Sequence, residues 1–92
     1  MENQVRQHFR FSGRVQGVGF RYTAQFEARS LSLSGWVKNC ADGSVELEAQ
    51  GDAGAIAALV KRLRDDRFIR IESTECHSMP LEPSERGFRI CF

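Results

Sequence analysis

The stretch GRVQGVGFRY, residues 13–22, contains three glycines, and Arg21 follows shortly after the last of them. Glycine suits turns in which the chain takes positive φ or a ligand approaches the backbone amides closely. We expect Gly17 and Gly19 to form such a turn, whose amides surround a tetrahedral oxyanion. Arg21 adds a planar guanidinium that can hold two oxygens of one phosphoryl group. The predicted phosphate-binding backbone comprises Gln16, Gly17, Val18, Gly19 and Phe20.

Known glycine motifs do not fit this stretch. The dinucleotide-binding fingerprint would need a third glycine where Tyr22 stands, and a P-loop would need Gly-Lys where Val18 and Gly19 stand. The RNP1 pattern of RNA-binding domains matches QGVGFRYT in part, but Val18 replaces an aromatic residue. An RNA-binding domain of the same fold therefore stays an alternative, which stoichiometric RNA binding without phosphatase activity would support.

The elements around the glycines alternate between strand and helix. Phe9 and Phe11 alternate with polar residues, which predicts a half-buried strand over residues 7–15. Apolar residues then recur at spacings of three and four, which predicts a helix over residues 20–31 with Tyr22 and Phe26 in its apolar stripe. The glycine turn would thus lead into a helix N-terminus, whose free amides and dipole attract anions.

A hairpin and a second strand–helix–strand unit follow. SGWVKNC and SVELEAQ flank Asp42-Gly43, which predicts two antiparallel strands joined by a type I′ turn. Asp52 is a good N-cap for a helix over residues 53–66, and residues 68–76 and 87–92 are typical of strands. This order predicts an α+β, ferredoxin-like βαββαβ sandwich: two helices on one face of an antiparallel sheet, with a short extra C-terminal strand.

Length and composition limit the function. The 92 residues, 41% hydrophobic, predict one domain over residues 1–92 with a small core. With 13 basic against 12 acidic residues the formal net charge is +1, so an anion site must be local and nucleic acid is not expected as a partner. No apolar leader or membrane-length segment is evident, so we expect a cytoplasmic protein, and we expect a monomer. The cysteines, Cys40, Cys76 and Cys91, form no CxxC pair and predict reduced thiols and no metal site.

The motifs GRVQGVGFRYTAQFEA and SGWVKNCADGSVE, with a closing GFRI, resemble the acylphosphatase family across the whole chain. The resemblance implies hydrolysis of the carboxyl–phosphate bond of acyl phosphates without metal or cofactor, with inorganic phosphate as product and inhibitor. By motif position, Arg21 resembles the family's substrate-phosphate arginine and Asn39 the asparagine that orients the attacking water. Without the family resemblance, the sequence would also fit Arg21 as a surface residue of the helix and Asn39 as a residue that begins a turn.

The resemblance leaves one further alternative function, and the chain departs from the family pattern after each predicted helix: the usual Gly-Pro after the second helix is absent, and the first helix is followed by Ser32. Similar domains act as carbamoyl-phosphate-processing or binding modules inside larger maturation proteins, whereas this sequence ends at Phe92 without a partner catalytic domain to feed. Relatives usually carry glycine after the first helix, where this chain has Ser32. A left-handed backbone at Ser32 would cost about 1–2 kcal/mol in stability and leave activity intact.

Overall fold

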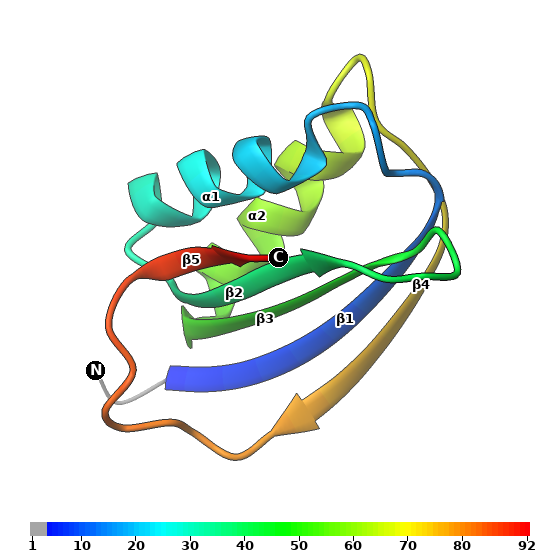
Figure 1. The fold of residues 1–92 in the computed structure, drawn as a ribbon. Helices are drawn as coiled ribbons and strands as arrows, with labels where there is room; N and C mark the ends of the chain where they lie inside the picture. The colour runs from blue at the N-terminus through cyan, green and yellow to red at the C-terminus, as the bar shows by residue number, and fades with distance from the viewer. Residues whose placement is uncertain (1–3) are drawn as a thin grey trace.

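Five strands and two helices make up the computed structural model, which describes residues 4–92. The strands are β1 (Gln4–Arg14), β2 (Ser34–Asn39), β3 (Val45–Asp52), β4 (Arg70–Met79) and β5 (Phe88–Cys91), and the helices are α1 (Phe20–Ser30) and α2 (Ala53–Asp65). The sheet order is β4-β1-β3-β2-β5, and both helices cover the same face (Figure 1). The predicted ferredoxin-like α+β fold is confirmed.

The sheet is mixed, however, rather than wholly antiparallel. β4, β1, β3 and β2 pair antiparallel, as predicted, whereas β5 pairs parallel to β2. The reason is the path of residues 80–87, which run along one end of the sheet from the β4 edge to the β2 edge (Figure 1). The chain therefore enters β5 at the end where β2 also begins.

The core lies between the helix-covered face of the sheet and the helices. Phe9 stands opposite Leu47, and Leu47 opposite Val37, so three buried side chains form one row across the sheet. Phe11 and Val45 form the next pair toward the glycine loop, and both are fully buried. The alternation predicted from Phe9 and Phe11 is confirmed, because residues at period two share a face of a strand.

The two helices are fixed in different ways. Asp52 caps α2 as predicted, since its Oδ2 accepts hydrogen bonds from the amides of Gly54 and Ala55 at 3.0 and 3.3 Å. The expected buried stripe of α1 is only partly right: Tyr22 and Phe26 are 64% and 71% exposed. The buried residues of this helix are Phe20, Ala24 and Ala28. Neither helix in the described part of the chain is long and apolar enough to cross a membrane.

Two local predictions need correction. The β2–β3 hairpin is present, but its turn is not type I′, because Gly43 (φ 94°) has positive φ and Asp42 does not. The amide of Gly43 donates to the carbonyl of Cys40 at 3.1 Å, so the turn spans residues 40–43 and ends on a left-handed glycine. β4 begins at Arg70 rather than at Phe68, which lies in the preceding loop and is 64% exposed.

Candidate active site

A cavity of about 110 Å³ lies where the β1–α1 loop, the first turn of α1 and the end of β2 meet. Its walls are formed by Val15, Gly17, Gly19, Phe20, Arg21, Tyr22 and Asn39. Most of the predicted site residues are thus brought together, from segments about twenty positions apart in sequence. Gln16 and Val18 are not in this wall: Gln16 contacts the β2–β3 hairpin, and Val18 packs against the core.

The loop backbone leads into the first turn of α1 at the cavity. Gly17 and Gly19 have φ values of 74° and 81°, in the left-handed region that favours glycine. Gly19 is also the N-cap of α1, and capping by a side chain is absent among residues 4–92, so the first amides of this helix lack a side-chain acceptor there. Free amides and the helix dipole together make this end electropositive. The loop and α1 therefore offer donors to an anion.

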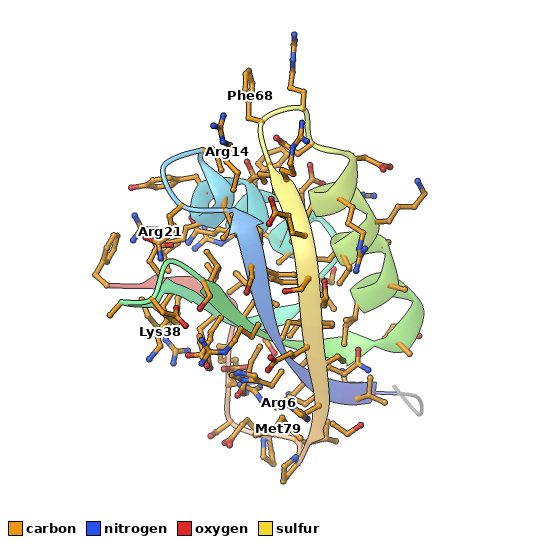
Figure 2. The ribbon with its side chains drawn as sticks, turned by 90° about the vertical axis from the view of Figure 1, so that its right-hand side faces the viewer. Arg6, Arg14, Arg21, Lys38, Phe68 and Met79 are labelled. Atoms are coloured by element: carbon orange, nitrogen blue, oxygen red, sulfur yellow. The ribbon has the colours of Figure 1, made fainter. Side chains whose placement is uncertain are left out.

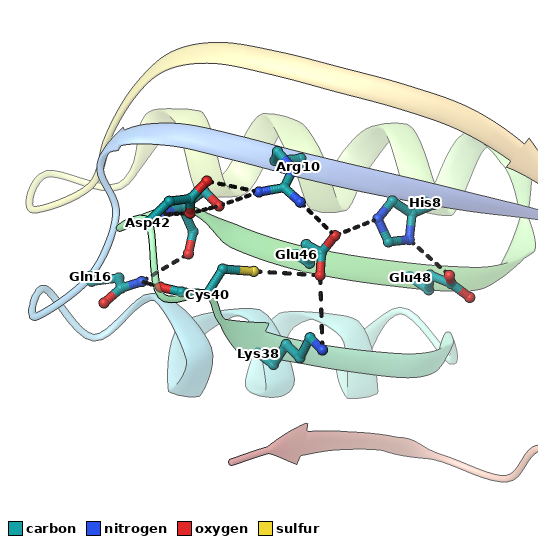
Figure 3. Close-up of polar contacts among 9 residues, drawn as sticks. His8, Arg10, Gln16, Lys38, Cys40, Asp42, Glu46 and Glu48 are labelled. Carbon is teal, nitrogen blue, oxygen red and sulfur yellow. Dashed lines mark hydrogen bonds and ion pairs between the residues drawn. The ribbon is translucent and has the colours of Figure 1, made fainter.

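Buried contacts hold both ends of the loop. Val15 is fully buried before the glycines, and Phe20 is buried after them, with its ring centroid 5.4 Å from that of Phe11. Between them, Gln16 Nε2 donates to the backbone carbonyls of Cys40 and Ser44 at 2.7 and 2.8 Å (Figure 3). These contacts tie the loop to the hairpin that follows Asn39. The hydrogen bonds from the Gln16 side chain to the hairpin could not be predicted from the sequence, because no sequence pattern indicates that these two segments are in contact.

Arg21 reaches the cavity from the first turn of α1 (Figure 2). No carboxylate of residues 4–92 lies within ion-pair distance of its guanidinium. Its described neighbour is the ring of Phe92, whose centroid lies 5.0 Å from Cζ. A cation in the first turn is unfavourable toward the helix dipole, and a bound anion would offset this cost. The contact with Phe92 was not predicted, since no motif spacing relates these positions.

Asn39 is the last residue of β2 and stands opposite Val45 of β3. Its Oδ1 is buried and has no hydrogen-bond partner among residues 4–92. Buried polar atoms are almost always paired, so an amide oxygen without a partner, on a residue that lines a cavity, indicates a hydrogen-bond donor from outside the described chain. A water molecule held beside Arg21 would satisfy it.

The hairpin after Asn39 is held by a polar network (Figure 3). Asp42 Oδ1 accepts hydrogen bonds from the Ser44 hydroxyl at 2.6 Å and the Ser44 amide at 3.0 Å, and these bonds lower the pKa of Asp42. Arg10 contacts Asp42 Oδ2 and Glu46 Oε2, both at 3.1 Å. The hairpin that follows Asn39 is therefore braced by charges on the open face of the sheet. The three cysteines are free thiols.

Fold and site together define a class: a ferredoxin-like α+β domain with a cavity lined by a glycine loop, an arginine and an asparagine whose Oδ1 has no partner among residues 4–92. The chain belongs to the acylphosphatase family, whose model matches residues 7–90. It is 47% identical over 90 residues to an acylphosphatase of Bifidobacterium longum, covering 96% of this chain and 93% of the relative.

Solved structures agree with this membership. The crystal structure of acylphosphatase from Bacillus subtilis superposes with a TM-score of 0.88 at 34% identity, covering 96% of this chain and 99% of that one. The crystal structure of T. kodakarensis HypF superposes with a TM-score of 0.83 at 29% identity, but the match covers 96% of this chain and only 12% of that chain. This fold thus occurs both nearly alone and as a small part of a longer protein.

Proposed function

We propose that the chain hydrolyses acyl phosphates to a carboxylate and inorganic phosphate in the cavity between the glycine loop and Asn39. Family membership supports the reaction type. The observation that carries the site is that one cavity is lined both by Asn39, whose buried Oδ1 has no hydrogen-bond partner among residues 4–92, and by Arg21, whose guanidinium has no ion-pair partner among the same residues. An anion held by Arg21 and a water held by Asn39 would lie next to each other there.

The phosphoryl group is held by fixed donors. The amides of the loop and of the first turn of α1 bind the phosphoryl oxygens, and Arg21 binds two of them through its planar fork. These donors cost little reorganisation during the reaction, because Val15, Phe20 and the Gln16 side chain already hold the loop in place. Phosphoryl transfer requires chiefly such positioning and charge stabilisation.

The attacking water is held by Asn39. Its Oδ1 accepts a hydrogen bond from the water and aims the water oxygen at phosphorus, opposite the leaving carboxylate. The new P–O bond forms as the P–O bond to the acyl carboxylate breaks, and the carboxylate leaves with the electron pair of that bond. The water proton passes to a phosphate oxygen, so the reaction needs no protein base. We further propose that it needs no metal and no cofactor.

Hydrolysis of benzoyl phosphate in excess chelator tests this proposal. We expect turnover that is unchanged by chelator and competitively inhibited by inorganic phosphate. Phosphate should also shift amide resonances of residues 16–21. Arg29→Ala, which removes an exposed arginine at the other end of the same helix, should leave turnover unchanged. Activity that disappears with chelator and returns with a divalent cation would contradict the metal-free reaction, and shifts confined to other regions would contradict the site.

A second candidate, a carbamoyl-phosphate-processing or binding module, is favoured by the likeness to a 12% part of the T. kodakarensis protein. Kinetics distinguish the two proposals. A hydrolase of broad substrate specificity should turn over benzoyl and carbamoyl phosphate with comparable kcat/KM, since the loop amides and Arg21 recognise the phosphoryl group alone. Turnover restricted to carbamoyl phosphate would favour the module.

A further inference from the structure

A second, larger cleft adjoins the candidate active site. It has a volume of about 300 Å³ and is lined by Arg14, Gly17, Val18, Arg67, Phe68, Ile69 and Arg70. Gly17 also lines the active-site cavity, so the glycine loop forms a wall common to both. The cleft therefore begins where a substrate bound by its phosphoryl group would extend beyond the loop.

The cleft concentrates positive charge in a chain whose formal net charge is only +1. Arg14, Arg67 and Arg70 are all exposed, and none lies within ion-pair distance of a carboxylate in the described part of the chain. Elsewhere most arginines of the described strands are paired, as Arg6 and Arg10 are with glutamates. The three cleft arginines have no such folding role.

The strand register makes this charge costly. Arg14 of β1 stands directly opposite Arg70 of β4. Like charges directly opposite each other on neighbouring strands destabilise a sheet. Asp66 forms no ion pair with any of the three arginines in the described part of the chain, and its Oδ1 accepts a hydrogen bond from the amide of Phe68 at 2.8 Å. A bound anion between the arginines would offset the repulsion.

One side of the cleft is apolar. Phe68 is 64% exposed on the α2–β4 loop, and it stands next to Arg14 at the top of the molecule (Figure 2). The guanidinium of Arg67 lies 5.3 Å from the centroid of the Phe68 ring. Val18 packs against the core beneath. An apolar wall beside cations fits a carbon skeleton that ends in a negative group.

We propose that this arginine cleft binds the acyl part of the substrate and selects acyl phosphates that carry a second anionic group, a carboxylate or a phosphate. This inference rests on the proposed function of the neighbouring cavity. The phosphoryl group occupies the loop, the carbon skeleton passes Gly17 and lies against Phe68, and the second anion meets Arg14, Arg67 and Arg70.

Two substrates of equal shape test the cleft: 4-carboxybenzoyl phosphate and its neutral analogue, 4-carbamoylbenzoyl phosphate. With the unaltered chain we expect kcat/KM to favour the carboxylate by about 5- to 10-fold at low ionic strength, a preference that decreases with salt. Arg14→Gln, Arg67→Gln and Arg70→Gln combined should bring the ratio close to one. The three corresponding lysine substitutions should keep it above about 3-fold, because they keep the charge.

The control is Arg86→Gln. Arg86 is exposed next to Glu85, which pairs with Arg6 at the opposite end of the molecule from Phe68 (Figure 2). Arg86→Gln removes one arginine charge far from the cleft and should leave the ratio as in the unaltered chain. Circular dichroism checks folding, which the triple glutamine variant should retain because it removes the Arg14–Arg70 repulsion. A ratio near one in the unaltered chain, or an equal loss with Arg86→Gln, would overturn the proposal.

Binding without turnover separates this inference from the proposed function. Calorimetry with 4-carboxybenzylphosphonate and 4-carbamoylbenzylphosphonate should show that the carboxylate binds about 5- to 10-fold more tightly than its neutral analogue. The triple glutamine variant should lose this preference. Equal affinity for the two phosphonates would overturn the arginine cleft. Absence of hydrolysis of every acyl phosphate would instead contradict the proposed function, and the phosphonate titration would still decide on the cleft.

Discussion

At the scale of single residues, Arg21 and Asn39 each lack a partner among residues 4–92: Arg21 lacks a counter-ion and Asn39 lacks a hydrogen-bond donor. Arg21 has no carboxylate of residues 4–92 within ion-pair distance, and it lies at the helix end where a cation is unfavourable. Asn39 is a neutral amide whose oxygen is buried without a donor. The first is suited to bind an anion, the second to aim a water, and substitutions should separate these roles.

Substitution of Arg21 by lysine should lower phosphate affinity and turnover together. Lysine keeps the charge but loses the planar fork, so contacts to two phosphoryl oxygens cannot both be kept. We expect phosphate to bind about 10-fold more weakly or worse, with a comparable loss of kcat/KM. This is about the effect of losing one charge-assisted hydrogen bond. Isothermal titration with phosphate and steady-state kinetics measure the two quantities. Unchanged phosphate affinity would show that Arg21 does not bind the phosphoryl group.

Substitution of Asn39 by alanine should affect turnover almost alone. The loop amides and Arg21 remain, so phosphate affinity should stay within a few-fold, whereas kcat should fall by about 10²–10³, as when one preorganised donor or acceptor is lost. The same titration and kinetics apply, with circular dichroism to check folding. Near-normal turnover, or a loss of phosphate affinity as large as that of Arg21→Lys, would contradict the water-positioning role.

At the scale of elements, the α1–β2 connection contains the one non-glycine residue with positive φ among residues 4–92. Ser32 has φ of 59°, directly after the last turn of α1. Its amide donates to the carbonyl of Arg29 and the amide of Leu33 to that of Ala28, both within 3.1 Å, so the helix ends in a left-handed cap. The strain expected at this position is therefore present in the fold.

Substitution of Ser32 by glycine should raise the free energy of unfolding by about 0.5–1 kcal/mol. Glycine removes the left-handed strain of about 1–2 kcal/mol, and its greater freedom in the unfolded chain cancels part of the gain. Chemical denaturation measures the change, and kcat should not move. Gly43→Ala is the opposite control, because Gly43 has φ of 94° and alanine should destabilise. A less stable Ser32→Gly variant would show that the serine side chain contributes more than its strain costs.

At the scale of the whole molecule, the open sheet face fastens the C-terminal segment. Arg6 is almost fully buried and donates to Glu48 at 2.8 Å and to Glu85 at 2.7 Å. Gln50 Nε2 donates to the carbonyl of Glu82 at 3.1 Å, and Gln50 Oε1 accepts from the Glu82 amide at 2.7 Å. These contacts bind residues 82–85 across the end of the sheet and so guide the chain into β5.

Acid should weaken the Arg6–Glu85 ion pair and so lower the stability of the fold. Burial opposes ionisation of Glu85, but its hydrogen bond with Arg6 and the Arg6 charge outweigh burial and lower the pKa below its usual 4.5. The Glu85 contribution to stability is therefore fully present above pH 4.5 and is lost as pH falls through the lower folded-state pKa. We expect the free energy of unfolding to decrease with acidification below pH 4.5, measured by urea denaturation at several pH values.

Substitution of Glu85 by glutamine should remove that part of the acid dependence. At pH 7 it should also cost about 2 kcal/mol, since it breaks a buried ion pair and leaves Arg6 with Glu48. Glu82→Gln is the matched control, because the Glu82 side chain is exposed and the contacts of this residue are made by its backbone. Equal pH profiles for both variants would show that the Arg6–Glu85 pair does not carry the acid dependence.

The sequence by itself determined the fold class, because its signals are local. The alternation of Phe9 and Phe11 and the Asp52 cap each depend on a few neighbouring residues, and both occur as predicted. The left-handed position at Ser32 followed from the family resemblance, and it is also present. Spacing also placed Gly17 and Gly19 before a helix, so the direction of the free amides followed from the order of elements. The resemblance to a known family, rather than sequence spacing, predicted that Arg21 and Asn39 belong to the same site.

The tertiary structure alone decided what depends on neighbours distant in the chain. The parallel direction of β5 depends on the path of residues 80–87, and the exposed face of α1 depends on which side the sheet covers. The tie from Gln16 to the hairpin and the unpaired Oδ1 of Asn39 arise only when separate segments pack together. The Arg14–Arg70 pairing likewise requires the β1–β4 register. Hydrogen bonds and charges act over a few ångströms in space, whatever the separation along the chain, and sequence spacing does not report that proximity.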